Sequence, residues 1–193
     1  PQQGGVEDVG PVGGGDQDDA LVGLETVHLD EQLIEGLLAL VVAAAETGAV
    51  LGGAPENHVQ VLRDYAYKIG MAYQMVDDLL DVRGDAVKLG KPVGNDLLQG
   101  VMTLPTIMLM ERYPDDNLIC ELFKDRGPDG LFPPDGKVSR TMEMINNSTI
   151  VEDCYEVIRG YCDDARLALE ALPDCEARGS LMVLADYIWE RSH

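Results

Sequence analysis

Residues 70–105 read GMAYQMVDDLLDVRGDAVKLGKPVGNDLLQGVMTLP, and the DDLLD run within them begins at Asp77. A helix turns about 100° per residue, so side chains three and four positions apart share one face. Asp77, Asp78 and Asp81 therefore fall with Gln74 inside one arc of a predicted helix. Carboxylates at this spacing repel one another, which indicates a bound cation or a cationic partner; the ordinary alternative is a solvated acidic face. Oxygen ligands of this kind suit Mg²⁺.

The charge of the chain excludes several classes of partner. Its 193 residues include 14 Lys and Arg against 35 Asp and Glu, a formal net charge of −21. We therefore expect no binding to nucleic acid or to anionic membrane surfaces. No apolar run reaches the length of about 18 residues that a transmembrane helix needs, so no membrane span is predicted. The four cysteines lack metal-like spacing and are expected to be reduced thiols in the core of a cytoplasmic protein.

The spacing of apolar residues predicts an all-α chain. Residues 1–28 are acidic and rich in glycine, and they lack the periodic apolar content that would favour folding. From Leu29 onward the pattern is helical, with Tyr67 and Tyr73 assigned to the core of the second helix. A glycine-rich loop is expected over residues 83–102. The predicted helices cover residues 29–51, 56–82, 104–113, 116–124, 137–146, 150–172 and 175–191.

The run GxAYQxxDDxLDxxGD, followed by LGKPxGxDLxxGxxTLP, resembles the second aspartate-rich region of the trans-polyprenyl diphosphate synthases. A DDxxD run alone is a weak signal, but its combination with GKPxGxDL and TLP at this spacing is specific. The resemblance extends over about residues 45–192. It implies a helical bundle of the isoprenoid synthase type and a transferase that condenses an allylic diphosphate with isopentenyl diphosphate.

The same resemblance implies roles for individual residues. Asp77, Asp78 and Asp81 resemble the ligands of Mg²⁺ ions that bridge to the allylic diphosphate. Gln74 resembles the side chain beside that diphosphate, and Lys91 resembles the lysine that contacts its phosphates. Two further aspartates, Asp85 and Asp96, either assist this site or brace the loop, and the bracing role is favoured.

The chain also departs from the family pattern. The family's first aspartate-rich motif is absent, so we expect a bundle that is incomplete at its N-terminal side: residues 1–28 are either disordered or foreign to the family, and residues 29–193 form a partial prenyl synthase domain. The chain alone is then expected to be inactive. The alternative is a non-catalytic partner subunit of a prenyl synthase heterodimer. Either case favours a homo- or hetero-oligomer, and the length of the product is left open.

Overall fold

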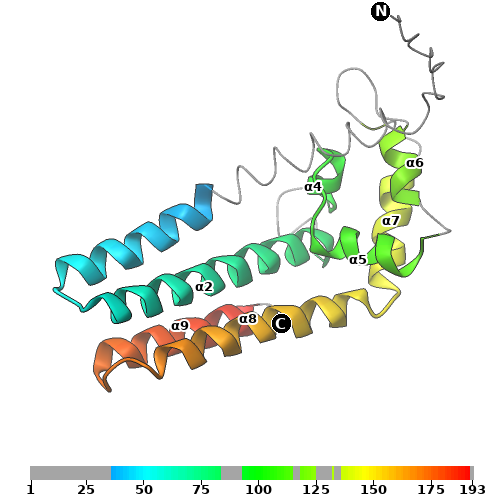
Figure 1. Cartoon of the computed structure of the whole chain (residues 1–193). Helices are drawn as coiled ribbons and strands as arrows, with labels where there is room; N and C mark the ends of the chain where they lie inside the picture. The colour runs from blue at the N-terminus through cyan, green and yellow to red at the C-terminus, as the bar shows by residue number, and fades with distance from the viewer. Residues whose placement is uncertain (1–35, 84–92, 115–117, 125–131, 133–135, 192–193) are drawn as a thin grey trace, which may run out of the picture.

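A computed structural model of the chain describes residues 36–83, 93–114, 118–124, 132 and 136–191, and every regular element in these ranges is a helix (Figure 1). The all-α prediction is thereby confirmed. None of the described helices is long and apolar enough to cross a bilayer. After a helix over residues 36–51, the chain forms α2 (Glu56–Arg83), α4 (Asn95–Leu98), α5 (Leu104–Arg112), α6 (Leu118–Lys124), α7 (Lys137–Asn146), α8 (Ile150–Leu169) and α9 (Glu176–Arg191).

Helix α2 is the central element of the fold. Figure 1 shows α8 and α9 along one side of α2, and the helix over residues 36–51 along the other side. The buried side chains of α2 recur at intervals of three and four positions, which places them on one face. This face packs against α8 in a continuous apolar core. Its central members are Tyr65, Ile69, Ala72, Val76 and Leu79.

A tight turn and a close helix crossing join the first helix to α2. The backbone N–H of Gly52 donates to the carbonyl of Gly48 at 3.0 Å, and Gly53 follows with a φ of 72°, which a glycine adopts without steric penalty. At the crossing, a Cβ placed on Gly70 would stand 2.6 Å from Cδ1 of Leu38. The absence of a side chain at this position therefore allows the two helices to approach.

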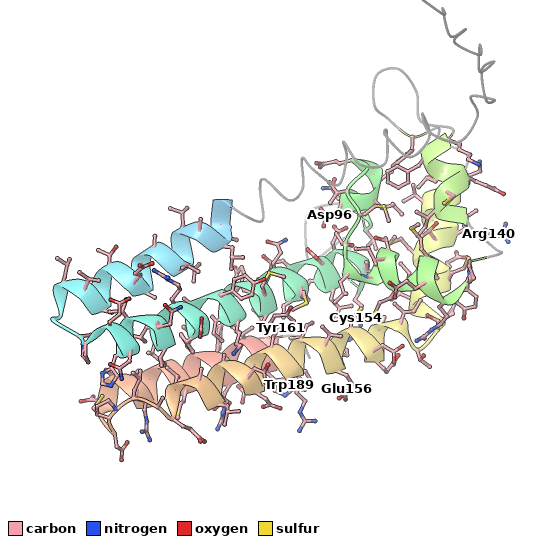
Figure 2. The ribbon with its side chains drawn as sticks, in the orientation of Figure 1. Asp96, Arg140, Cys154, Glu156, Tyr161 and Trp189 are labelled. Atoms are coloured by element: carbon pink, nitrogen blue, oxygen red, sulfur yellow. The ribbon has the colours of Figure 1, made fainter. Side chains whose placement is uncertain are left out.

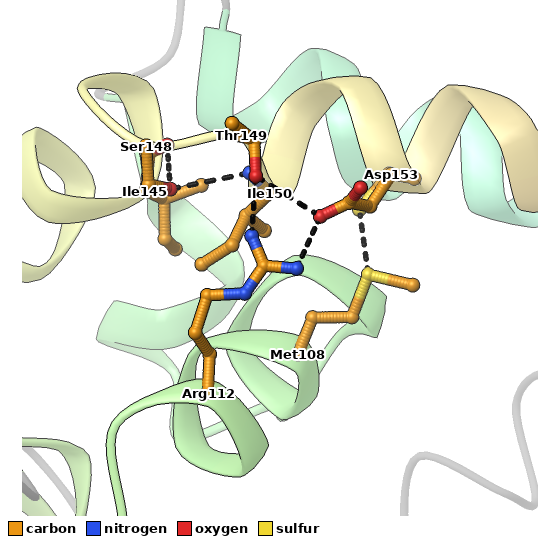
Figure 3. A network of polar contacts seen from close by, with 8 residues as sticks. Met108, Arg112, Ile145, Ser148, Thr149, Ile150 and Asp153 are labelled. Carbon is orange, nitrogen blue, oxygen red and sulfur yellow. Dashed lines mark hydrogen bonds and ion pairs between the residues drawn. The ribbon is translucent and has the colours of Figure 1, made fainter.

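The short helices α4 to α7 gather around the C-terminal end of α2 (Figure 1). Asn146, at the end of α7, donates from Nδ2 to the carbonyl of Val82 at 3.2 Å, which ties α7 to the last turn of α2. Figure 3 shows a second tie, in which Arg112 at the end of α5 reaches the start of α8. Its Nη1 donates to Oγ1 of Thr149 at 2.5 Å, and its Nη2 pairs with the carboxylate of Asp153.

The structure corrects parts of the sequence prediction. The expected loop over residues 83–102 contains the one-turn helix α4 in its described part, because Gly94 turns the chain at a φ of 74° and α4 starts at the next residue. Tyr67 and Tyr73 are exposed, not in the core, since both lie at the border of the buried face of α2. Residues 1–28, Asp85 and Lys91 lie outside the described part of the chain.

The cysteine prediction is confirmed in part. None of the four cysteines, all of which lie in the described part of the chain, forms a disulfide, and Cys154 and Cys162 are buried in the core, as expected. Cys120 is half-buried and Cys175 is exposed, so the core assignment was wrong for Cys175, which lies just before the first residue of α9.

Candidate functional site

The C-terminal turns of α2 carry the DDLLD run, and its carboxylates open into a cavity of about 410 Å³. The structure therefore brings together Gln74 and the three aspartates that the sequence pattern singled out, and their roles as ligands stay predictions. Two polar residues join them from outside α2, one from α4 and one from the end of α9. The residues that line the cavity are Gln74, Asp77, Asp78, Leu80, Asp81, Asp96 and Arg191.

Asp78 is the most deeply placed of these carboxylates. Its side chain belongs to the buried face of α2, and the residue is only 6% exposed. The amide Nε2 of Gln74, one turn earlier on the helix, donates to its Oδ1 at 2.9 Å. A buried carboxylate is costly unless it is hydrogen-bonded or paired with a cation. The burial of Asp78 therefore argues against the interpretation of the DDLLD run as an ordinary solvated face.

Asp81 connects α2 to α4. The backbone N–H of Asp96 donates to Oδ2 of Asp81 at 3.1 Å, and the N–H of Gly94 donates to the carbonyl of Asp81 at 3.0 Å. These two bonds hold the first turn of α4 against the end of α2. Figure 2 shows where Asp96 lies on α4. The backbone of Asp96 thus joins α4 to α2, and Asp96 also lines the cavity beside the carboxylates, so its side chain is placed for either of the two predicted roles.

Asp77 is paired with a cation that the sequence pattern did not indicate. The Nη2 atom of Arg191, in the last turn of α9, lies 3.1 Å from Oδ1 of Asp77. The guanidinium also lies over the ring of Tyr73, with Cζ 4.9 Å from the ring centroid. A hydrogen bond with the side chain of Tyr73, and then the charge of Asp77, raise the pKa of Arg191. The arginine is therefore a permanent positive charge at the rim of the cavity.

The donor chemistry of the cavity suits a hard divalent cation. The aspartates and the side-chain amide of Gln74 offer oxygen donors, and Mg²⁺ and Ca²⁺ prefer oxygen ligands. Within the described residues, no three His, Cys, Asp or Glu side chains converge closely enough to form a metal cage. Mg²⁺ commonly binds one or two carboxylates and completes its shell with water and phosphate oxygens. The residues present fit that open mode of binding.

Known proteins match most of the length of this chain. The family model described as polyprenyl synthetase matches residues 37–130, which include α2, α4 and α5. The short chain isoprenyl diphosphate synthase of Methanothermobacter thermautotrophicus is 34% identical over 164 residues, which cover 84% of this chain and 49% of that protein. Component 2 of the heptaprenyl diphosphate synthase of Geobacillus stearothermophilus is 34% identical over 154 residues, covering 80% and 46%.

Solved structures share the helical arrangement. A decaprenyl diphosphate synthase from Rhodobacter capsulatus superposes with a TM-score of 0.71 and 32% identity, covering 91% of this chain and 56% of that one. A polyprenyl synthase from Caulobacter crescentus, solved with calcium and isoprenyl diphosphate, gives a TM-score of 0.70 and 28% identity, with 91% and 55% covered.

The extent of these matches is as informative as their identity. The chain spans about half the length of the curated relatives it matches, while most of its own length is aligned. The aligned part includes the helix that carries the DDLLD run and the residues around it. The chain therefore belongs to the polyprenyl synthetase family and has the isoprenoid synthase fold over its described helices.

Proposed function

We propose that this chain contributes one side of the active site of a polyprenyl diphosphate synthase, which condenses an allylic diphosphate with isopentenyl diphosphate in the presence of Mg²⁺. The observation that carries the proposal is the buried, hydrogen-bonded carboxylate of Asp78 in a cavity lined by three further aspartates. The calcium and isoprenyl diphosphate in the Caulobacter crescentus structure support the same choice of ligands.

In the proposed reaction, the allylic C–O bond breaks and diphosphate leaves with the bonding electrons. The double bond of isopentenyl diphosphate then attacks the allylic carbon, and the resulting carbocation loses a proton to the released diphosphate or to water, which gives the elongated product. Mg²⁺, when bound, supplies positive charge that stabilises the departing diphosphate. Asp77, Asp78 and Asp81 would hold it, and the hydrogen bond from Gln74 keeps Asp78 in position. Lys91 is proposed to contact the phosphates, a role for which a mobile ammonium is suited.

Binding of Mg²⁺ to the full chain, measured by titration calorimetry, tests the site directly. Asp77→Asn and Asp81→Asn should each weaken binding by about tenfold or more, because ligands contribute at least as much as the groups that orient them. Glu156→Gln is the matched control, since it removes one negative charge from an exposed position of α8 away from the cavity. Equal affinities for the wild-type chain and both aspartate variants would refute the assignment.

We further propose that the chain alone has little or no synthase activity. The aspartates that line the cavity in the described structure come from α2 and α4, and two opposed sets of carboxylates are expected to be needed to align the diphosphate for ionisation. The purified chain is therefore expected to release no detectable elongated product from an allylic diphosphate and radiolabelled isopentenyl diphosphate. Robust Mg²⁺-dependent elongation by the purified chain would show that one side of the site is sufficient.

A second candidate function is that of a non-catalytic partner subunit in a prenyl synthase heterodimer. The Geobacillus stearothermophilus relative is named as one component of its enzyme, which supports assembly with a second subunit but not the non-catalytic role. Co-expression with a full-length synthase of the same organism separates the two candidates. A partner subunit should co-purify and change the product length or rate, whereas a chain without this role should leave both unchanged. We also propose that the protein acts in the cytoplasm, where thiols stay reduced; the lack of a disulfide among its four described cysteines supports this.

A further inference from the structure

Arg191 is positioned at the carboxylate cavity by contacts with two side chains of α2. Tyr73 and Asp77 are four residues apart on α2, so their side chains lie one above the other on the same face. The guanidinium of Arg191 reaches across from α9 and contacts both, with Nη2 3.1 Å from Oδ1 of Asp77 and Cζ 4.9 Å from the centroid of the Tyr73 ring. Arg191 also lines the cavity together with Asp78, Asp81 and Asp96.

This position places Arg191 in competition with any cation that binds Asp77. A guanidinium and a divalent ion that share one carboxylate would stand within a few ångströms of each other, where like charges repel strongly, even at a protein surface. The pair is half-exposed, so its own strength is modest and a divalent ion can displace it. Displacement would also move the guanidinium off the ring of Tyr73, so the loss of the cation–π contact adds to the free-energy cost of displacement.

We infer that Arg191 is a built-in counter-cation of the cavity: it occupies Asp77 when no metal is bound, and a divalent cation displaces it. This inference rests on the proposed function, because it assumes that Asp77 receives the metal. Its consequence is that metal binding is coupled to the C-terminal end of α9. The arginine therefore lowers the affinity of the empty site for metal and at the same time stabilises that site against the repulsion of its own aspartates.

Calorimetric titration of the full chain with Mg²⁺ tests the inference through Arg191→Gln. Loss of the competing charge should tighten Mg²⁺ binding by about three- to tenfold, the range expected for a half-exposed ion pair with an added cation–π contact. Tyr73→Leu should tighten binding to a smaller extent, since Arg191 then keeps its carboxylate but loses the ring. The affinities for Ca²⁺, titrated in the same way, are expected to fall in the same order: Arg191→Gln, then Tyr73→Leu, then the wild-type chain.

Arg159→Gln is the matched control. It removes the same charge from α8, where the guanidinium lies over the ring of Trp189 at 5.8 Å and does not line the cavity. The change in net charge is identical in the two variants, so any general increase in cation attraction appears in both. The competition is therefore measured by how much more Arg191→Gln increases the affinity for Mg²⁺ than Arg159→Gln does.

Trp189 provides a second measurement that does not depend on affinity. It is the only tryptophan of the chain and lies two residues before Arg191 on α9. Its ring packs edge-on against Tyr155, with the centroids 6.2 Å apart. Saturating Mg²⁺ should change its fluorescence in the wild-type chain as Arg191 leaves Asp77. The change should be smaller in Arg191→Gln, although that variant binds Mg²⁺ more tightly.

The outcomes separate this inference from the proposed function. If Arg191→Gln binds Mg²⁺ more tightly than Arg159→Gln does, displacement is supported. The same holds for that result if the wild-type chain binds Mg²⁺ too weakly to measure. Equal or weaker binding by Arg191→Gln, with binding by the wild-type chain intact, overturns the inference and leaves the metal site standing. Absence of binding in the wild-type chain and in Arg191→Gln overturns both.

Discussion

Asp78 differs from the other aspartates of the DDLLD run in its burial. Asp77 and Asp81 are half-buried at the edge of α2, whereas Asp78 belongs to the face that packs against the core. The amide of Gln74 makes this burial tolerable, because it donates to the carboxylate where water has little access. One residue thus serves the core and the cavity, and its replacement is expected to affect folding as well as binding. For this reason Asp77 and Asp81 are the better positions for tests of the site.

The thiols should differ sharply in reactivity. Burial raises the pKa of Cys154 to about 12 and that of Cys162 to about 11. At pH 8 almost none of either thiol is ionised, and the thiolate is the reactive form. We predict that a thiol reagent at this pH modifies Cys175 rapidly and leaves Cys154 and Cys162 unmodified until the chain unfolds. Mass mapping of the alkylated peptides checks the order, and rapid labelling of Cys154 in the folded chain would contradict it.

At the level of the elements, the crossing of α2 with the first helix depends on Gly70. A glycine within a helix costs about 1 kcal/mol relative to alanine, and the close approach of Leu38 explains its presence here. Gly70→Val should therefore destabilise the fold by about 1–3 kcal/mol through overpacking. Urea unfolding measures the change.

Gly160 in α8 provides the matched control for that experiment. No atom lies within 4 Å of a Cβ placed on Gly160, so alanine meets nothing there. Gly160→Ala should stabilise the chain by about 0.5–1 kcal/mol through helix propensity alone. Gly70→Ala should increase the free energy of unfolding by less than this, because the side chain of Leu38 has to move aside. Equal gains at both glycines would show that the crossing does not depend on Gly70.

The contact between α5 and α8 allows a further prediction, which concerns its contribution to stability. Arg112 contacts both Thr149 and Asp153 at the start of α8 (Figure 3), where a carboxylate also interacts favourably with the helix dipole. Both partners of the ion pair are more than a third exposed, so screening by solvent keeps its contribution small. Arg112→Ala should cost about 1 kcal/mol of unfolding free energy.

A double-mutant cycle with Asp153→Ala isolates the pair, and the cycle of Arg159 with Asp163 on α8 is the comparison. The second pair joins neighbouring turns of one helix and is more exposed. Its coupling energy should therefore be smaller, about 0.3–0.5 kcal/mol. A coupling energy for Arg112 and Asp153 no larger than this would show that the contact does not hold α5 against α8.

For the molecule as a whole, the most informative feature is the exposed surface of the first helix. Leu40 and Leu51 are 70% and 83% exposed, and Leu37 and Val50 are also exposed. A helix that is apolar on nearly all sides is normally buried, and an exposed apolar patch marks an interaction surface. We therefore predict that the purified chain self-associates with rising concentration, as sedimentation velocity would show.

A pair of substitutions locates that surface. Leu40→Glu should shift the distribution toward the monomer, because a charge at this position disfavours contact with another apolar surface. Leu167→Glu on α8, where the leucine is similarly exposed, should have a smaller effect. A wild-type chain that remains a single species at every concentration would refute the prediction.

The sequence by itself determined most of the secondary structure and the family. The recurrence of apolar residues every three or four positions predicted the helix over residues 56–82, found as Glu56–Arg83, because that spacing is a local property of the chain. The DDLLD run likewise placed three carboxylates on one arc, since residues at i, i+1 and i+4 of a single helix have fixed relative directions.

Only the tertiary structure decided which groups surround those carboxylates. Arg191 is more than a hundred residues from Asp77 in the chain, and no periodicity or short motif connects the two. Tyr73 is apolar enough to resemble a core residue in a sequence pattern, but the packing of α9 leaves it at the surface under the guanidinium. The contacts that complete the site depend on how α2, α4 and α9 pack, and packing is a property of the whole fold.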